Sequence, residues 1–257
     1  MIGYLGVPGV MVALPYRGGL DTSSDRPVSF TRTSGGKRKA FVGAHSRREW
    51  GVSFDLMASR EALGLLEVAR SVGEVAWYPA DATAGNLLSP QASGFYPAPA
   101  GATDAGLVQL PDGTVARSVV SSETVIVGPG ARESVAVRPG EPVTVGAWFM
   151  SAAILRGFWR NAAGSSMTNW AESFGSHTGW AWREVTLTPP PGAAFIDLHL
   201  AAGSRYALPS VSWGNSAAQR PGRGCPKAVV HGLSEALSVI HQDDAYGSVG
   251  VTITEVG

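Results

Sequence analysis

Three carboxylates in the second half of the chain, Glu172, Glu184 and Asp197, are residues whose type could support bond cleavage. Glycoside hydrolysis uses two acids held about 5 to 9.5 Å apart across a sugar ring. Charged residues on strands, however, usually face solvent. The sequence also does not place any two of these three acids on opposite sides of a cleft. We therefore expect no catalytic residue in the chain, and a glycoside hydrolase is the least favoured of three functional alternatives.

Tryptophans give the chain a second kind of chemistry. An exposed indole ring can stack on the apolar face of a sugar, although a β-rich core also needs aromatic side chains, and for any single tryptophan the core is favoured. Trp170 and Trp180 flank a segment of Gly, Ser and His from which a loop could present them, and Trp182 shares a strand face with Trp180. We predict these three as glycan contacts. Six of the eight tryptophans lie in or at the edge of residues 85–214: Trp148, Trp159, Trp170, Trp180, Trp182 and Trp213.

One concentration of basic residues comprises Lys37, Arg38, Lys39, Arg47 and Arg48. They lack a pattern of interleaved aromatic residues, since Phe41 alone stands among them, and the twenty basic residues of the chain are balanced by twenty acidic ones. We therefore expect no nucleic-acid binding. The default interpretation is a solvated loop, and ion pairs with a neighbouring subunit are the better functional alternative. We predict these five residues as an oligomer interface.

Other catalytic and metal-binding signatures are absent from the sequence. The five histidines are scattered; His177 is expected in a loop and His199 within a strand. Asp243 and Asp244 suit a hairpin turn better than a calcium loop. Cys225 is the single cysteine, which excludes an internal disulfide and a thiolate metal cluster. We expect no metal, no cofactor and no enzymatic activity.

The composition is that of a soluble globular protein. The 257 residues are 44% hydrophobic and 16% charged, which is enough to bury a core and to form two domains. No apolar run approaches the roughly 20 residues that span a bilayer. Residues 1–15 lack the basic start and the cleavage site of a signal peptide. We expect neither membrane insertion nor export.

Two arms of the chain, residues 1–84 and 215–257, each look incomplete. In residues 49–56 apolar and polar residues alternate with the period of two that is typical of a strand. A helix is predicted over residues 59–72, with Ser59 as its N-cap and Gly73 at its end. The second arm supplies a predicted hairpin, which is marginal by itself. We predict that the arms together form one α+β domain.

Between the arms, residues 85–214 show short apolar runs separated by Pro-Gly and Ala-Gly turn signals, without a long helix. This pattern is typical of a β-sandwich. Residues 214–226, rich in Gly, Pro and Arg, are expected to lead back to the second arm, either mobile or draped over a surface. The predicted fold class is mainly β: a β-rich α+β domain with one main helix, interrupted by an inserted sandwich.

The inserted segment resembles the carbohydrate-binding-module sandwiches of the galactose-binding-like, jelly-roll type. The resemblance covers about half the chain and rests on three parts of the sequence: Asn86-Leu87-Leu88, residues 137–148, and residues 182–187 followed by 189–194. It implies a jelly-roll fold and a possible sugar ligand. In that family the closing strand often carries an acidic residue at a structural calcium site, whereas residues 208–213 here contain none, so the resemblance implies no metal.

The arms resemble minor tail proteins of long-tailed phages, especially the distal tail type. The features are Ser46-Arg47-Arg48-Glu49-Trp50 before a strand, the single helix, Ala76-Trp77-Tyr78-Pro79 before the insertion, and the ending 251–257. The resemblance implies a virion protein of the tail tip, made in the host cytoplasm. It also implies a homo-oligomer, with a hexameric ring favoured, that joins the tail tube to the tip or baseplate. The sandwich would then project outward and contact host-surface polysaccharide. The alternative is a glycan-binding adhesion module on a side or decoration protein.

Overall fold

The computed structural model describes residues 2–7, 10–15, 21–25, 28–32, 37–42, 47–58, 67–68, 73–128, 133–138, 140–241 and 244–256. Strands dominate these ranges, which confirms the predicted mainly β class. The complete helices within them are short: α2 (Ala80–Thr83) and α3 (Pro90–Ser93). Of the helix predicted over 59–72, only Glu67 and Val68 are described, and both are helical. The rest of that prediction lies outside the described residues.

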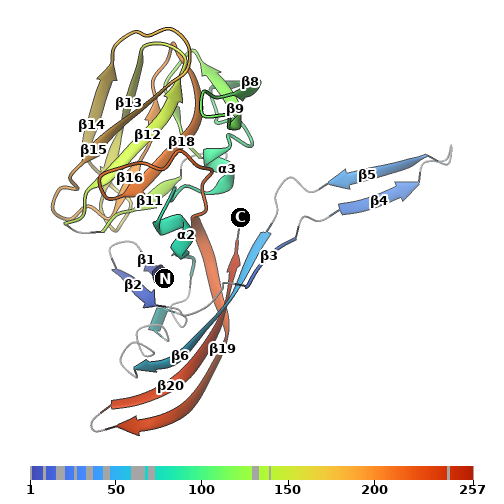
Figure 1. Cartoon of the computed structure of the whole chain (residues 1–257), viewed down its shortest axis with the longest axis vertical. Helices are drawn as coiled ribbons and strands as arrows, with labels where there is room; N and C mark the ends of the chain where they lie inside the picture. The colour runs from blue at the N-terminus through green and yellow to red at the C-terminus, as the bar shows by residue number, and fades with distance from the viewer. Residues whose placement is uncertain are drawn as a thin grey trace. The chain divides into compact units, whose positions relative to one another are not determined.

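The chain divides into two compact units (Figure 1). The first contains residues 14–75 and 227–257, and the second contains residues 2–13 and 76–226. Residues 2–13, 76–84 and 215–226 thus group with the sandwich, whereas the sequence placed them in the arms. The physical reason is visible at Tyr4, whose ring packs edge-on against Trp213 with 5.1 Å between centroids. The Arg138 guanidinium lies 4.4 Å from the centroid of the same tyrosine ring.

The first unit is built on an antiparallel sheet in the order β19 (Cys225–His241), β20 (Asp244–Glu255), β6 (Arg47–Ala58) and β3 (Asp21–Asp25). The predicted period of two in β6 is confirmed, because alternate residues are buried. These residues pair across the sheet with buried residues of β20: Trp50 with Ile253, Val52 with Val251, and Phe54 with Val249.

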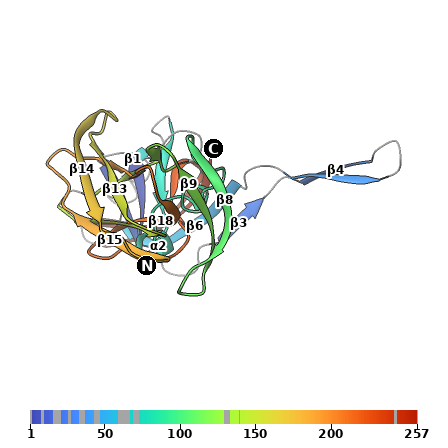
Figure 2. The ribbon, with the colours of Figure 1, turned by 90° about the horizontal axis from the view of Figure 1, so that it is seen from above.

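A separate two-stranded sheet in this unit joins β4 (Val28–Arg32) to β5 (Arg38–Val42) (Figures 1 and 2). Within the described ranges it is hydrogen-bonded to no other strand. Its described side chains, from Val28 to Arg32 and from Arg38 to Ala40, are all exposed. We refer to these two strands, together with Lys37, as the β4–β5 hairpin.

The second unit is a sandwich of two sheets. One sheet has the order β15 (Ala181–Leu187), β12 (Val143–Phe149), β18 (Arg205–Trp213), β9 (Val115–Ser121) and β8 (Ala102–Gln109). The other has the order β10 (Val125–Ile126), β17 (His199–Leu200), β13 (Ala153–Arg160), β16 (Phe195–Asp197) and β11 (Ser134–Ala136), with β14 (Ser166–Phe174) beside β13. In this unit β1 (Ile2–Val7) lies between β2 (Val10–Pro15) and β7 (Val75–Tyr78).

The core of the sandwich lies between its two sheets. Alternate residues of β12 face it, and they contact buried side chains of the opposite sheet and of the connecting segments. The intervening residues of β12, Thr144, Gly146 and Trp148, are buried as well. The outer face of this strand is therefore covered too. The core residues of β12 are Val143, Val145, Ala147 and Phe149.

The two segments that lead into and out of the sandwich are fixed to it by Asn86, which is 1% exposed. The Asn86 amide donates to the carbonyl oxygens of Pro209 (2.9 Å) and Arg220 (3.0 Å). Its oxygen accepts from the amides of Leu88 and Val211. Residues 214–226 are therefore draped over the sandwich. Gly224 makes the close approach possible, because a Cβ atom there would lie 1.8 Å from the Leu87 carbonyl oxygen.

Candidate functional site

The candidate binding site is a hollow between the end of β14 and strand β15. Strand β15 is the outermost strand of its sheet. Trp182 and Glu184 project from one face of this strand and Arg183 projects from the other. All three line the hollow, which therefore borders both faces of the strand. Its lining residues are Ser173, Phe174, Gly175, Ser176, Trp182, Arg183 and Glu184.

Trp182 is held in place on three sides. Its ring lies over Gly146, where a Cβ atom would come within 2.5 Å of Trp182 Cζ2. It packs edge-to-face against Trp148, with centroids 5.9 Å apart. The indole Nε1 donates to Glu184 Oε2 over 2.9 Å. A half-buried indole fixed in this way at the border of a hollow can offer part of its apolar surface to a sugar ring.

The other predicted tryptophans are placed differently. Trp180 is half-buried beside Trp148 in a small apolar cluster, and the Arg205 guanidinium lies 5.7 Å from its ring centroid. Trp170 is 8% exposed and belongs to the sandwich core. It lies over Gly157, where a Cβ atom would approach Trp170 Cζ2 to 2.9 Å. The structure therefore removes Trp170 from the candidate contacts, because its ring fills the space above a glycine of the neighbouring strand.

Arg183, Ser173 and Ser176 are lining residues that the sequence argument missed. Arg183 is exposed, and its guanidinium could donate paired hydrogen bonds to an oxygen-rich ligand. The alternation in Trp182-Arg183-Glu184 would have indicated that the residues lie on opposite faces of one strand. It could not indicate that this strand is the outermost one, where both faces border one hollow.

The three carboxylates considered for hydrolysis have different surroundings. Asp197 is fully buried, forms an ion pair with Arg160 Nε and accepts a hydrogen bond from Ser134 Oγ. It cannot reach a sugar on the surface. Glu184 lines the hollow and accepts hydrogen bonds from Trp182 and from the amide of Ala217. Glu172 is exposed on β14, outside the lining of the hollow.

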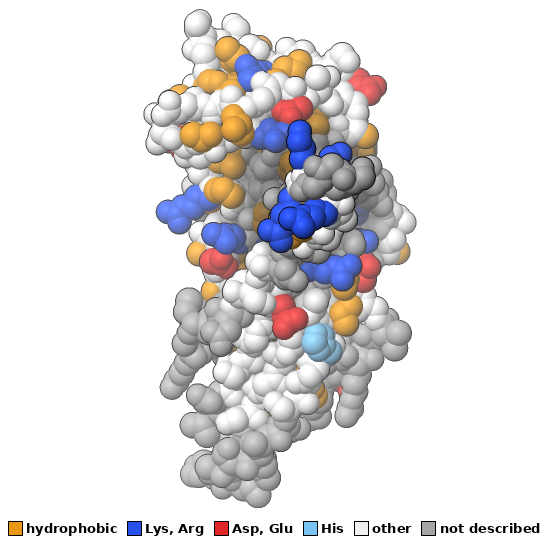
Figure 3. Space-filling view, turned by 90° about the vertical axis from the view of Figure 1, so that its right-hand side faces the viewer, with side chains coloured by type: hydrophobic (Ala, Val, Ile, Leu, Met, Phe, Trp, Pro, Cys, Tyr) orange, Lys and Arg blue, Asp and Glu red, His pale blue; other side chains and the backbone are white. Residues whose placement is uncertain are grey.

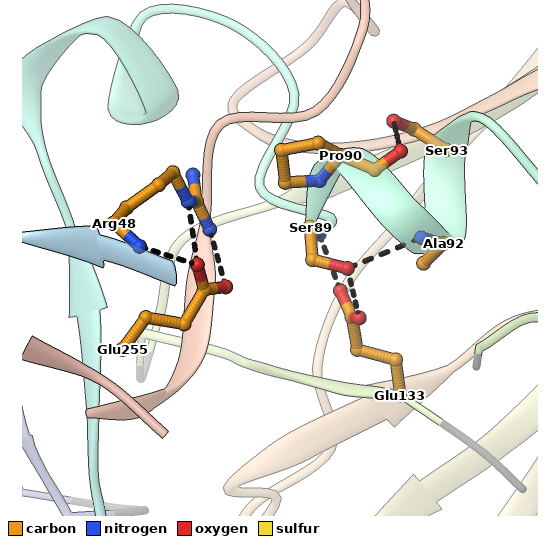
Figure 4. A network of polar contacts seen from close by, with 7 residues as sticks. All are labelled: Arg48, Ser89, Pro90, Ala92, Ser93, Glu133 and Glu255. Atoms are coloured by element: carbon orange, nitrogen blue, oxygen red, sulfur yellow. Dashed lines mark hydrogen bonds and ion pairs between the residues drawn. The ribbon is translucent and has the colours of Figure 1, made fainter. Parts of the chain in front are cut away.

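Four of the five basic residues predicted as an oligomer interface are exposed. Lys37, Arg38 and Lys39 are exposed at the β4–β5 hairpin, and Arg47 is exposed at the start of β6. Figure 3 shows Lys and Arg side chains on the hairpin, which points toward the viewer there. Arg48 differs, because it is buried and its guanidinium forms a 2.8 Å ion pair with Glu255 (Figure 4). The exclusion of Arg48 from the interface is a correction, since this pair ties β6 to β20.

Hairpin pairing adds two residues to this surface. The register sets Arg32 opposite Arg38 and Phe30 opposite Ala40. The Arg38 guanidinium lies 5.2 Å from the Phe30 ring centroid, and 59% of Phe30 is exposed. The β4–β5 hairpin thus presents an exposed aromatic side chain among basic ones, an arrangement that the linear sequence did not reveal.

The remaining candidate residues from the sequence are the cysteine, two histidines and the two aspartates of the predicted hairpin turn. Cys225 is fully buried. His199 is buried, with its ring 5.4 Å from that of Phe158, and a ring nitrogen of His177 lies 3.0 Å from the Gly179 carbonyl oxygen. Asp244 begins β20, and Asp243 lies outside the described residues. In the described ranges no three His, Cys, Asp or Glu side chains are grouped to hold a metal ion, and no described helix is long and apolar enough to cross a membrane.

Two buried tyrosines of the sandwich unit resist ionisation. Burial raises the pKa of Tyr206 to about 12, an effect that the positive charge of Arg156 partly offsets. The Tyr206 hydroxyl donates to the Ala201 carbonyl oxygen. Burial also raises the pKa of Tyr78, whose hydroxyl accepts a hydrogen bond from the Ala136 amide. Both hydroxyls therefore have structural roles.

Comparisons with known proteins give distant likenesses. No protein-family model matches the chain, and none of the curated proteins matches it. Among solved structures, the chain is similar to the enzymatically active domain of tailspike protein 4 of bacteriophage CBA120, with a TM-score of 0.37 and 11% identity over 50% of this chain and 21% of that one. The chain thus spans about a fifth of the length of the tailspike structure.

Two carbohydrate-binding structures are also similar at 11% identity. One, described as "CBM4 structure and function", has a TM-score of 0.28 over 51% of this chain and 96% of the other. The second, of carbohydrate-binding modules from the β-sandwich superfamily, has a TM-score of 0.31 over 84% and 85%. At these TM-scores the likenesses assign neither a family nor a function to the chain.

Proposed function

We propose that the chain is a structural virion protein of a phage tail tip, whose copies assemble into a closed ring through the β4–β5 hairpin. The ring would join the tail tube to the tip or baseplate, and the sandwich would face outward. The proposal combines the resemblance of the arms with one structural observation, the uncovered hairpin. Its homo-oligomer is expected to have six subunits, and its other partners would be the tube and hub proteins.

The hairpin supports assembly because its two described strands pair with each other and with no other described strand. A two-stranded sheet by itself is marginal in water. Val28 and Phe30 are 47% and 59% exposed, and the like charges of Arg32 and Arg38 lie directly opposite each other. Such opposed charges are destabilising. Contact with acidic and apolar groups of a second copy would cover the aromatic ring and neutralise the arginines.

The test of assembly compares the full chain with a variant carrying Val28→Ser and Phe30→Ser. Light scattering coupled to size-exclusion chromatography is expected to give an oligomer for the unmodified chain and a smaller species for the variant. Leu107→Ser is the matched control, because Leu107 is 70% exposed on β8 of the sandwich. A monomer at high concentration for the unmodified chain, or equal oligomers for all three proteins, would refute assembly through the hairpin.

For the sandwich, we propose contact with host-surface glycan at the hollow between β14 and β15. The observation in favour is the combination of a fixed indole, a guanidinium, a carboxylate and two serine hydroxyls around one depression. This set offers an apolar surface as well as donors and acceptors, which suits a polyhydroxylated ring. A side or decoration protein with this site is the second candidate. Hydrolysis is less supported because Asp197 is buried, so we propose binding without cleavage.

The test of glycan contact is binding to host wall polysaccharides on an array. Trp182→Ala is expected to reduce binding, since it removes the apolar ring surface against which a sugar ring would pack. Leu107→Ala, on the far strand of the same sheet, is expected to leave binding unchanged. If the unmodified chain binds no polysaccharide, the sandwich is a spacer; if it releases sugar from the wall, the non-enzymatic proposal is wrong.

A further inference from the structure

Glu184 stands out because one oxygen atom of an exposed side chain receives two hydrogen bonds from different parts of the chain. Oε2 accepts from Trp182 Nε1 over 2.9 Å and from the Ala217 amide over 3.2 Å. Trp182 belongs to the candidate binding hollow, whereas Ala217 belongs to the segment that leaves the sandwich. The carboxylate therefore connects the hollow to that segment.

The indole has little freedom on its inner side. Trp182 pairs with Trp148 in the register of β15 with β12, and Glu184 pairs with Gly146. The indole lies over Gly146, which has no side chain to lift it away from the sheet. Contact with Gly146 and Trp148 limits how far the ring can tilt, and the hydrogen bond to Glu184 selects its direction. Together they fix the ring before any ligand arrives.

The segment on the other side of Glu184 is ordered by hydrogen bonds of its own. Thr144 Oγ1 donates to the Gly214 carbonyl oxygen over 2.7 Å. The Ala218 amide donates to Ser212 Oγ over 3.2 Å, and Ala217 is 5% exposed. The Ala217 amide bonds this stretch to a side chain of the hollow, Glu184. A change in the position of Glu184 would therefore alter the hydrogen bond of the Ala217 amide directly.

We infer that Glu184 is a positioning residue that sets the orientation of the Trp182 ring and couples it to the chain at Ala217. The inference rests on the proposed glycan contact for its biological meaning, but its geometry exists in the ligand-free protein. A ligand that presses on the indole would change the shared hydrogen bonds at Oε2. The segment at Ala217 would thereby respond to occupancy of the hollow.

The test uses the full chain without ligand, so that it does not depend on glycan binding. The ¹⁹F resonance of 5-fluorotryptophan at position 182, assigned with Trp182→Phe, reports the orientation of the ring. Hydrogen exchange at the Ala217 amide reports the second bond. Glu184→Ala is expected to shift the resonance and to speed exchange by about tenfold, because one net hydrogen bond is lost.

Two further variants separate positioning from general loss of structure. Glu184→Gln keeps an acceptor oxygen and is expected to restore both signals and any glycan binding. Gly146→Ala pushes the ring from below and is expected to move the same resonance while Glu184 is intact. Unchanged resonance and exchange in Glu184→Ala would overturn the inference, as would failure of Glu184→Gln to restore them. Absence of glycan binding by the unmodified chain would instead refute the proposed ligand.

Discussion

At the scale of single residues, burial separates the side chains that border the hollow from those that hold the fold together. Trp182, which was predicted as a glycan contact, lines the hollow together with Glu184, a carboxylate that the sequence argument assigned to solvent. Trp170, Arg48 and Asp197 have equally suitable types but are buried, because each packs against or pairs with a residue of another strand. Those partners are Gly157, Glu255 and Arg160 respectively. Local spacing contains no information about which distant residue will cover a side chain.

The buried pair of Asp197 and Arg160 provides a first prediction. Removal of the carboxylate in Asp197→Ala leaves a guanidinium that is nine-tenths buried without its counter-ion. The expected loss is about 3 to 5 kcal/mol in the free energy of unfolding. The control is Asp104→Ala in the exposed pair with Arg117, which should cost less than about 1 kcal/mol. Denaturant titration measures the free energy of unfolding of both variants. Equal losses would show that burial does not make the Asp197 pair more important for stability than the exposed pair.

The raised pKa of Tyr206 provides a second prediction. The unfolded chain releases this proton near pH 10, whereas the folded chain holds it to about pH 12. The contribution of this group to the free energy of unfolding is therefore fully present below pH 10. It falls by about 1.4 kcal/mol per pH unit as the pH rises from 10 to 12. Tyr206→Phe should decline less steeply over that range. An identical slope for both proteins in chemical unfolding would contradict the prediction.

At the scale of elements, alternation and turn signals predicted the strands well, as β6 and β20 illustrate. The paths of the connecting segments were harder to predict. Residues 2–13 group with the sandwich through Tyr4, and residues 214–226 are held by Asn86. Gly-rich connecting segments carry no regular periodic pattern, so their docking depends on individual ring contacts and hydrogen bonds that form only after the strands assemble. The same limit applies to the hollow, which exists because the end of β14 lies beside β15.

Asn86 provides a prediction at this scale. In Asn86→Ala, the carbonyl groups of Pro209 and Arg220 and the amides of Leu88 and Val211 lose a buried partner. The expected destabilisation is about 3 kcal/mol, since each unsatisfied buried group costs roughly 1 to 3 kcal/mol before relaxation. Asn161→Ala is the control, because Asn161 makes an exposed hydrogen bond to the Ser165 amide. A loss below about 1 kcal/mol in thermal unfolding would show that Asn86 does not fix the two segments.

At the scale of the whole molecule, the account joins two units with different tasks. The first unit presents the uncovered β4–β5 hairpin with Phe30 and its basic neighbours. The second presents the hollow at Trp182. The proposal gives assembly to the first and glycan contact to the second, so changes in the hairpin should leave glycan binding per subunit unaffected. Changes at Trp182 should leave the oligomer unaffected. Linked failure of both properties in either variant would contradict this division.

The central claim is that copies of this chain form a closed ring, and electron microscopy of the purified chain tests it most directly. The account predicts ring-shaped particles, with six subunits favoured. It also predicts that the rings disappear in the chain carrying Val28→Ser and Phe30→Ser and persist in the Leu107→Ser control. Single subunits or open chains of variable length for the unmodified protein would contradict the account.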